Sequence, residues 1–198
     1  MLRVAIERWL FLANAAVAVF VALPLAAPVL AYAGWLNAAN VIYVAYRSVC
    51  HQWAFRSYFL FGQSWTYTAD TMSSLAAEAD VFATRAHPLL GYKVAFCERD
   101  TAIYAAVLLA GLLYAIARRR AAPLSLGAYS LLILPMALDG FSQLLGWRES
   151  SPELRTITGA LFGAASAWLI YPRLDLVAGQ QSRPTAPRRS IHVSSAAP

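Results

Sequence analysis

An apolar run from Trp9 to Ala33, whose only strongly polar interior residue is Asn14, constrains the fold of this chain more than any other feature. A helix rises about 1.5 Å per residue, so this run is long enough to cross a hydrocarbon core roughly 30 Å thick. Further apolar runs cover residues 101–117, 123–147 and 155–171. Of the 198 residues, 60% are hydrophobic and 13% are charged, whereas a soluble domain is about half apolar and a quarter charged. The sequence therefore predicts an integral membrane protein of the all-α class.

Arginines beside the four runs predict their orientation. Arg3 and Arg8 precede the first run, a second group separates the second and third runs, and a third group follows the fourth. The positive-inside rule places all three groups in the cytoplasm. This predicts one membrane domain over residues 1–172, a four-helix bundle in the prokaryotic plasma membrane with both termini cytoplasmic and an external loop over residues 34–100. The second and third groups are Arg118, Arg119, Arg120, Arg173, Arg183, Arg188 and Arg189.

Three further segments need separate interpretation. Residues 38–62 are fairly apolar but carry two arginines and a histidine, which are costly at membrane depth. We therefore expect an extra interfacial or re-entrant helix on the outer side. Residues 31–34 resemble a signal-peptidase site, although the apolar run before them is longer than a usual signal core, which favours an uncleaved anchor. Residues 173–198 are rich in Ser, Pro, Ala, Arg and Gln and predict a disordered cytoplasmic tail.

On this topology, many polar residues gather at the outer membrane face. Asp139 and Gln143 are four residues apart, so they share a helix face. A carboxylate near the edge of the hydrocarbon should face inward and find a partner, for which Arg148 and Arg155 are the nearest candidates in sequence. Two interpretations stay open. The pair either fixes the helix register, or these four residues are the candidate catalytic residues of an active site.

The two cysteines, Cys50 and Cys97, both fall on the predicted outer side. In an oxidising compartment such a pair is first of all expected to form a disulfide. The alternative is a zinc site made of Cys50, His51, Cys97 and Asp100, which together supply two thiolates, an imidazole and a carboxylate. The Cys-x-x-Asp spacing would place the last two ligands on one turn of the chain.

Two further patterns have structural interpretations. Ser150 and Glu153 fit a capping box at the start of the fourth helix. Gly159 and Gly163 form a Gly-x-x-x-Gly pair, which predicts close helix packing within the chain.

Six blocks of the sequence together match the motifs of a known family. They are Cys50-His51-Gln52, Arg56-Ser57-Tyr58, Cys97-Glu98-Arg99-Asp100, Asp139-Gly140-Phe141-Ser142-Gln143, Gly146-Trp147-Arg148-Glu149-Ser150 and Arg155-Thr156-Ile157-Thr158-Gly159. With these blocks, the chain resembles a family of prokaryotic integral membrane proteins called domain of unknown function 2085, which has Cys-His-Gln and Cys-x-Arg-Cys motifs. The resemblance covers about residues 40–172, although Asp100 stands where the family has a second cysteine, and residues 63–93 look longer than the family's link. It implies a fold but no activity, and the family's Cys-His and Cys-x-x-Cys pattern implies a metal site more than a lone disulfide.

These patterns predict a membrane protein in the lipid bilayer with a polar site at its outer face. Whether that site holds a zinc ion as its cofactor, or no metal and a Cys50–Cys97 disulfide, stays open. The arginines favour an anionic substrate group, such as a lipid phosphate or carboxylate. The alternative function is a non-catalytic subunit or assembly factor that contacts other membrane-protein subunits, so the sequence leaves open whether the protein is an enzyme. The net charge of +6 comes from arginines beside the spans, which predicts contact with anionic lipid headgroups and no nucleic-acid partner.

Overall fold

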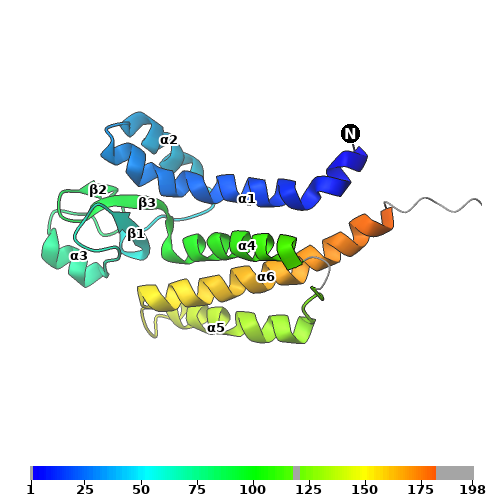
Figure 1. Ribbon diagram of the computed structural model, residues 1–198. Coiled ribbons are helices and arrows are strands. Elements are labelled where there is room, and N and C mark those ends of the chain that lie inside the picture. The colour runs from blue at the N-terminus through cyan, green and yellow to red at the C-terminus, as the bar shows by residue number, and fades with distance from the viewer. Residues whose placement is uncertain (1, 118–120, 182–198) are drawn as a thin grey trace, which may run out of the picture.

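The computed structural model describes residues 2–117 and 121–181. The predicted features on residues 118–120 and 182–198, which include six arginines and most of the tail, lie outside the described residues. Four long helices follow the four predicted apolar runs and lie side by side (Figure 1). They are α1 (Leu2–Tyr32), α4 (Glu98–Ala117), α5 (Leu126–Leu144) and α6 (Pro152–Gln181).

Helix α4 packs between α1 and α6, and α5 packs against α6. Glycines allow the closest of these contacts. A Cβ atom added at Gly163 would lie 2.2 Å from the carbonyl oxygen of Ile103, and one added at Gly159 would lie 2.8 Å from the carbonyl oxygen of Arg99. The predicted use of this glycine pair for packing within the chain is therefore confirmed. Helix α6 continues as far as Gln181, so it extends into the segment that we expected to be a disordered tail.

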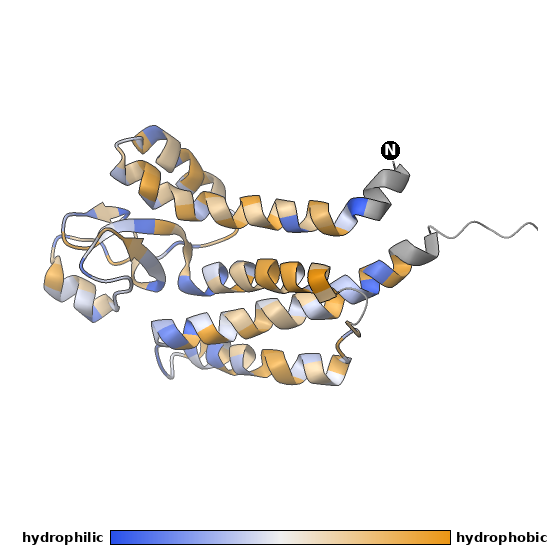
Figure 2. Ribbon diagram, in the orientation of Figure 1, coloured by the Kyte–Doolittle hydropathy of each residue, from blue (hydrophilic) through white to orange (hydrophobic). Residues whose placement is uncertain are grey.

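The long helices carry the apolar surface that a membrane protein needs. Within the described residues, Arg8–Tyr32 and Glu98–Ala117 are long and apolar enough to cross a membrane. Large apolar side chains on α5, including Leu131, Leu138 and Phe141, are more than half exposed. Figure 2 shows apolar residues along all four helices and hydrophilic residues near the helix ends.

The segment between α1 and α4 is a small α/β unit and not a loop with one helix, so the all-α prediction is wrong here. Its three-stranded antiparallel sheet has the order β1-β3-β2. The unit lies at the end of the long helices that is opposite to the start of α1 (Figure 1). In chain order, its elements are α2 (Leu36–Tyr46), a 3-10 turn (Ala54–Arg56), β1 (Ser57–Leu60), α3 (Ala69–Leu75), β2 (Ala86–His87) and β3 (Gly91–Cys97).

Strand β3 is the element that connects the sheet to the long helices. It begins at Gly91, where φ is +81° and an added Cβ would lie 2.3 Å from the carbonyl oxygen of Leu60. It ends at Cys97, which pairs with Ser57 of β1, and α4 begins at the next residue. The side chains of Val94 and Phe96 are buried in a cluster with Cys50 and Cys97. Both cysteines are therefore held where the sheet meets α4.

Candidate functional site

A polar cavity of about 240 Å³ lies where the sheet unit meets the ends of α4, α5 and α6. Its walls come from four parts of the chain that are distant in sequence: the segment after α2, the β3–α4 junction, the end of α5 and the start of α6. The lining residues are Val49, His51, Arg56, Cys97, Arg99, Asp100, Gln143 and Arg155. The cavity therefore brings three of the predicted zinc ligands, His51, Cys97 and Asp100, together with Gln143 and Arg155 of the predicted catalytic residues. Cys50, the fourth predicted zinc ligand, is not among the lining residues.

Cys50 and Cys97 are buried, free cysteines that lie in contact. The backbone N–H of Cys97 donates to the Cys50 sulfur over 3.2 Å, and the Cys97 thiol donates to Asp100 Oδ2 over 3.2 Å. The two sulfurs and a carboxylate oxygen of Asp100 all lie within 4.8 Å of one another. The predicted contact between the cysteines is confirmed, and it is not a disulfide.

His51, the fourth predicted metal ligand, is outside this group of three. Its side chain is exposed and meets the Trp53 ring edge to face, with the ring centroids 4.5 Å apart. It nevertheless lines the same cavity as Cys97 and Asp100.

The two thiols are electrostatically different although they are neighbours. A side-chain hydrogen bond between the two sulfurs lowers the pKa of Cys50, because it stabilises the Cys50 thiolate. This side-chain hydrogen bond, together with burial, raises the pKa of Cys97. One thiolate is therefore favoured beside one neutral thiol, and a cation bound between them would favour the loss of the second proton.

Asp139 is buried near the end of α5, and four side chains donate hydrogen bonds to its carboxylate. Arg148 donates to Oδ1 over 2.6 Å, and Arg99 forms an ion pair with Oδ2. Gln143 and Ser150 donate to Oδ2 over 3.1 and 3.0 Å. The prediction that Asp139 lies inside the protein and meets an arginine is confirmed for Arg148. Arg99 is a second partner that the sequence analysis did not name.

Arg155 does not pair with Asp139, and this part of the prediction is wrong. It donates to Glu98 Oε2 over 3.0 Å and to Glu149 Oε1 over 3.4 Å. The reason is the packing of α6 against α4, whose first residue is Glu98. The Glu98 side chain is fully buried and that of Arg155 is 4% exposed, so this is a buried ion pair.

Three arginines of the cavity wall keep unused hydrogen-bond donors. The Nε atoms of Arg56, Arg99 and Arg155 are buried and have no acceptor among the described residues. Arg56 also has no carboxylate partner there, and its guanidinium carbon lies 5.0 Å from the ring centroids of both Trp53 and Phe55. Burial and then the charge of Arg155 lower the pKa of Arg56. A buried donor without an acceptor is costly, so the cavity wall is suited to an anionic group.

Ser150 belongs to the site and not to a capping box, so that prediction is wrong. Helix α6 begins at Pro152, and Ser151 Oγ accepts from the Leu154 N–H over 3.3 Å. Ser150 is buried and donates to Asp139 instead. Glu98, Arg99 and Ser150 are thus the polar-network residues that sequence reasoning missed, although all three stand inside the motif blocks.

The fold and the cavity define a helical membrane protein with a small α/β unit and a buried polar network at one end of its long helices. The chain belongs to the family described as predicted membrane protein (DUF2085), whose model matches residues 83–169. It is 31% identical over 153 residues to an uncharacterized protein of Methanocaldococcus jannaschii. The aligned region covers 74% of this chain and 80% of that protein. No solved structure matches the chain. The family match includes Cys97, Arg99, Asp139 and Arg155, and it begins after Cys50.

Proposed function

We propose that this membrane protein binds a zinc ion and an anionic group together in the polar cavity. The proposal rests on the side chains that line this cavity. Three arginines with buried, unpartnered Nε–H groups lie beside the Cys97 thiol and the Asp100 carboxylate. Cation ligands and anion donors in one small space are the parts of a metal-assisted binding site.

The zinc part of the proposal rests on the ligand chemistry of Cys50, Cys97 and Asp100. Zinc bonds of about 2.3 Å to sulfur and about 2.0–2.2 Å to oxygen, in a tetrahedron, place ligand atoms roughly 3.5 Å apart. The 3.2 Å from Cys97 Sγ to Asp100 Oδ2 and the 4.8 Å limit for the whole group fit that spacing after small side-chain rotations. Three protein ligands leave one position open, as in catalytic zinc sites, and bound zinc would supply Lewis-acid chemistry there.

The anionic part rests on the charge around the cavity. Asp139 and Glu98 hold Arg99 and Arg155 by their terminal nitrogens, which leaves the Nε–H of each unused. Arg56 adds a third guanidinium that no carboxylate of the described residues neutralises. Guanidinium groups bind phosphate and carboxylate through paired N–H donors, so either group suits this wall.

The same proposal includes four membrane spans with the cavity at the outer face. The start of α1 and the end of α6 lie at the same end of the long helices, away from the sheet unit (Figure 1). An even number of crossings gives this arrangement. Arg8 and Arg173 lie toward that end, which agrees with the positive-inside rule.

Reporter fusions test this topology. Fusions after residue 120 and after residue 175 should report a cytoplasmic location, because the positive-inside rule places the neighbouring arginines there. A fusion near residue 75, in α3, should report the outside. An external signal at residue 120 would exclude the four-span arrangement.

Substitutions at Asp100 test the zinc ligands. We expect Asp100→Ala to lower zinc affinity about 10- to 100-fold or more, because one of three ligands is lost. Asp100→Cys should bind zinc at least as tightly as the unmodified protein, because thiolate is the softer ligand. Zinc competition with a chromogenic chelator measures both.

The matched control is Asp70→Ala, which removes an exposed carboxylate from α3 and should leave zinc affinity unchanged. If Asp100→Ala and Asp70→Ala bind zinc equally well, Asp100 is not a ligand. If even the unmodified protein binds no zinc, the metal part of the proposal is wrong, and the alternative of a non-catalytic subunit becomes the better prediction.

A further inference from the structure

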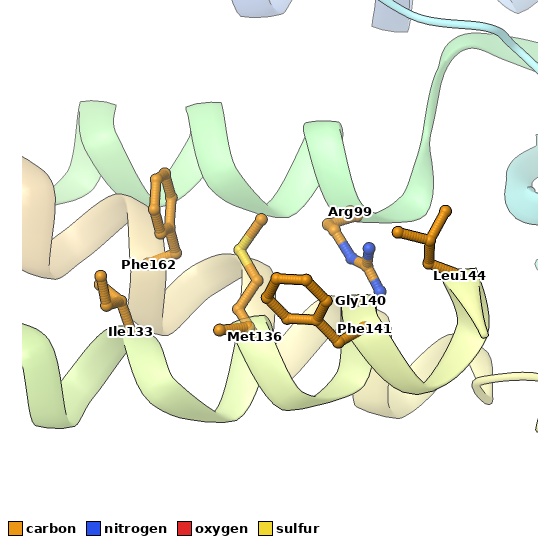
Figure 3. A pocket seen from close by; sticks show the side chains of 8 residues that line it. Arg99, Ile133, Met136, Gly140, Phe141, Leu144 and Phe162 are labelled. Atoms are coloured by element: carbon orange, nitrogen blue, oxygen red, sulfur yellow. The ribbon is translucent and has the colours of Figure 1, made fainter. Parts of the chain in front are cut away.

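A second cavity, of about 350 Å³, lies beside the polar one, and its lining is apolar except for Arg99 (Figure 3). Most of its wall belongs to α5, while Arg99 comes from α4 and Phe162 from α6. Figure 3 shows Phe162, Met136 and Phe141 following one another along the helices, with the Arg99 guanidinium near the end where α4 begins. The volume is within the range of about 300–1,000 Å³ that is usual for small-molecule sites.

Arg99 connects the two cavities. It lines the polar cavity beside Asp100 and the apolar cavity beside Gly140 and Phe141. Its Nη2 pairs with Asp139, while its buried Nε–H has no acceptor among the described residues. A ligand with an anionic end and an apolar end would therefore meet complementary surfaces on both sides of this one guanidinium.

We propose that the anionic ligand of this protein is an amphiphile, whose charged head enters the polar cavity and whose acyl chain lies in the apolar cavity of α5. This inference rests on the proposed anion site and adds the class of ligand. The positions agree with the proposed topology, because Arg99 is in the first turn of α4 at the outer end. Phe141 and Leu144, at the rim, are 64% and 80% exposed, so a chain could enter from the surrounding lipid.

A glycine in the apolar wall allows a selective test. Gly140 lines the apolar cavity, and nothing lies within 4 Å of a Cβ built there. Gly140→Leu should therefore occupy the space of the acyl chain without disturbing the helices. Gly127→Leu is the matched control, because Gly127 is on the same helix, has equally open surroundings and lies outside the cavity.

The experiment uses the full chain, purified in a neutral detergent, with three probes. The probes are dioleoyl phosphatidylglycerol, dioleoyl phosphatidylcholine and inorganic phosphate, and the shift of the unfolding temperature with concentration gives each apparent affinity. We expect phosphatidylglycerol to bind about tenfold or more tightly than the other two. Each methylene removed from apolar contact weakens binding about fourfold, so Gly140→Leu should weaken phosphatidylglycerol binding about tenfold or more. It should leave phosphate binding unchanged, and Gly127→Leu should change neither.

The other outcomes separate this inference from the proposed function. The acyl-chain site is wrong if phosphate binds the unmodified protein as tightly as phosphatidylglycerol does. It is also wrong if Gly140→Leu leaves phosphatidylglycerol binding unchanged. Neither result contradicts the anion site. If none of the three probes shifts the unfolding temperature, the anion site itself is wrong. If the two lipids bind equally well, the head group is not recognised by its charge, and the amphiphile inference fails.

Discussion

Replacement of Asp139 by alanine is expected to lower the free energy of unfolding by about 3 kcal/mol, because it removes one partner from a buried ion pair. The carboxylate is 1% exposed and neutralises Arg99, whose side chain is only 22% exposed. Arg148 is 45% exposed and can turn to water, so its loss of a partner adds little. Ser150 and Gln143 would also lose their acceptor in the network.

Thermal or chemical unfolding in detergent, followed by tryptophan fluorescence, measures this change. Asp139→Asn is the informative companion, because it keeps hydrogen-bonding atoms but removes the charge, so its effect should be between those of the unmodified and alanine proteins. Asp70→Ala, on the exposed face of α3, should change the stability by less than about 0.5 kcal/mol. An Asp139→Ala protein as stable as this control would mean that the buried network contributes nothing to the fold.

Gly163→Leu is expected to destabilise the protein by about 1–3 kcal/mol or more, because it overpacks a helix contact. The nearest atom to the added Cβ is a backbone oxygen of Ile103 at 2.2 Å, which no side-chain rotation can move away. Helix α4 would have to shift away from α6. Since Arg99 and Asp100 are in the first turn of α4, zinc affinity and anion binding should fall together with stability.

The control for this substitution is again Gly127→Leu, which has open surroundings on α5. Both variants add the same side chain to a helix, so a difference between them reports the close contact of α4 and α6. Unchanged stability and zinc affinity in Gly163→Leu would show that the two helices are not packed as closely as the structure has them.

The positions of the four long helices could be predicted from the sequence, because a long apolar run in a membrane protein nearly always forms a helix. The small sheet was not predicted, because the apolar segments of this chain were interpreted as parts of membrane helices or their connections. The signal was present in β3, where Gly91 opens a run rich in β-branched and aromatic residues that ends at Cys97. The residues of β3 that face inward are buried against α1 and α2, so they are apolar. In the sequence, the strand therefore resembles another apolar segment and lacks the alternation of a half-exposed strand.

The polar site could be predicted in part, because sequence spacing determines which residues of one helix lie together but not which helices pack against each other. Asp139 and Gln143 are one helical turn apart, so their shared position followed directly, and Arg148 is near in sequence. The partner of Arg155 depends instead on which helix packs against the start of α6. The spacing of residues within α6 does not show that this neighbour is α4. Glu98 and Arg99 were missed for the same reason, because both enter the site only through the packing of α4.

The cysteine site shows the same limit. Sequence alone left a disulfide and a metal site open, and the contact between Cys50 and Cys97 that both require is present. Asp100 joined them because it follows Cys97 by three residues at a strand-to-helix junction. His51 was predicted as a ligand because it follows Cys50 in the sequence, and in the structure it lines the same cavity without joining the group of three.

Zinc K-edge X-ray absorption of the purified, unmodified protein tests the central claim most directly, because it reads the identity and distance of the atoms around the metal. The account predicts about one zinc ion per chain with two sulfur neighbours at about 2.3 Å and at least one oxygen neighbour at about 2.0–2.2 Å. Zinc without sulfur neighbours, or a zinc-free protein whose Cys50 and Cys97 remain free after incubation with zinc, would contradict it.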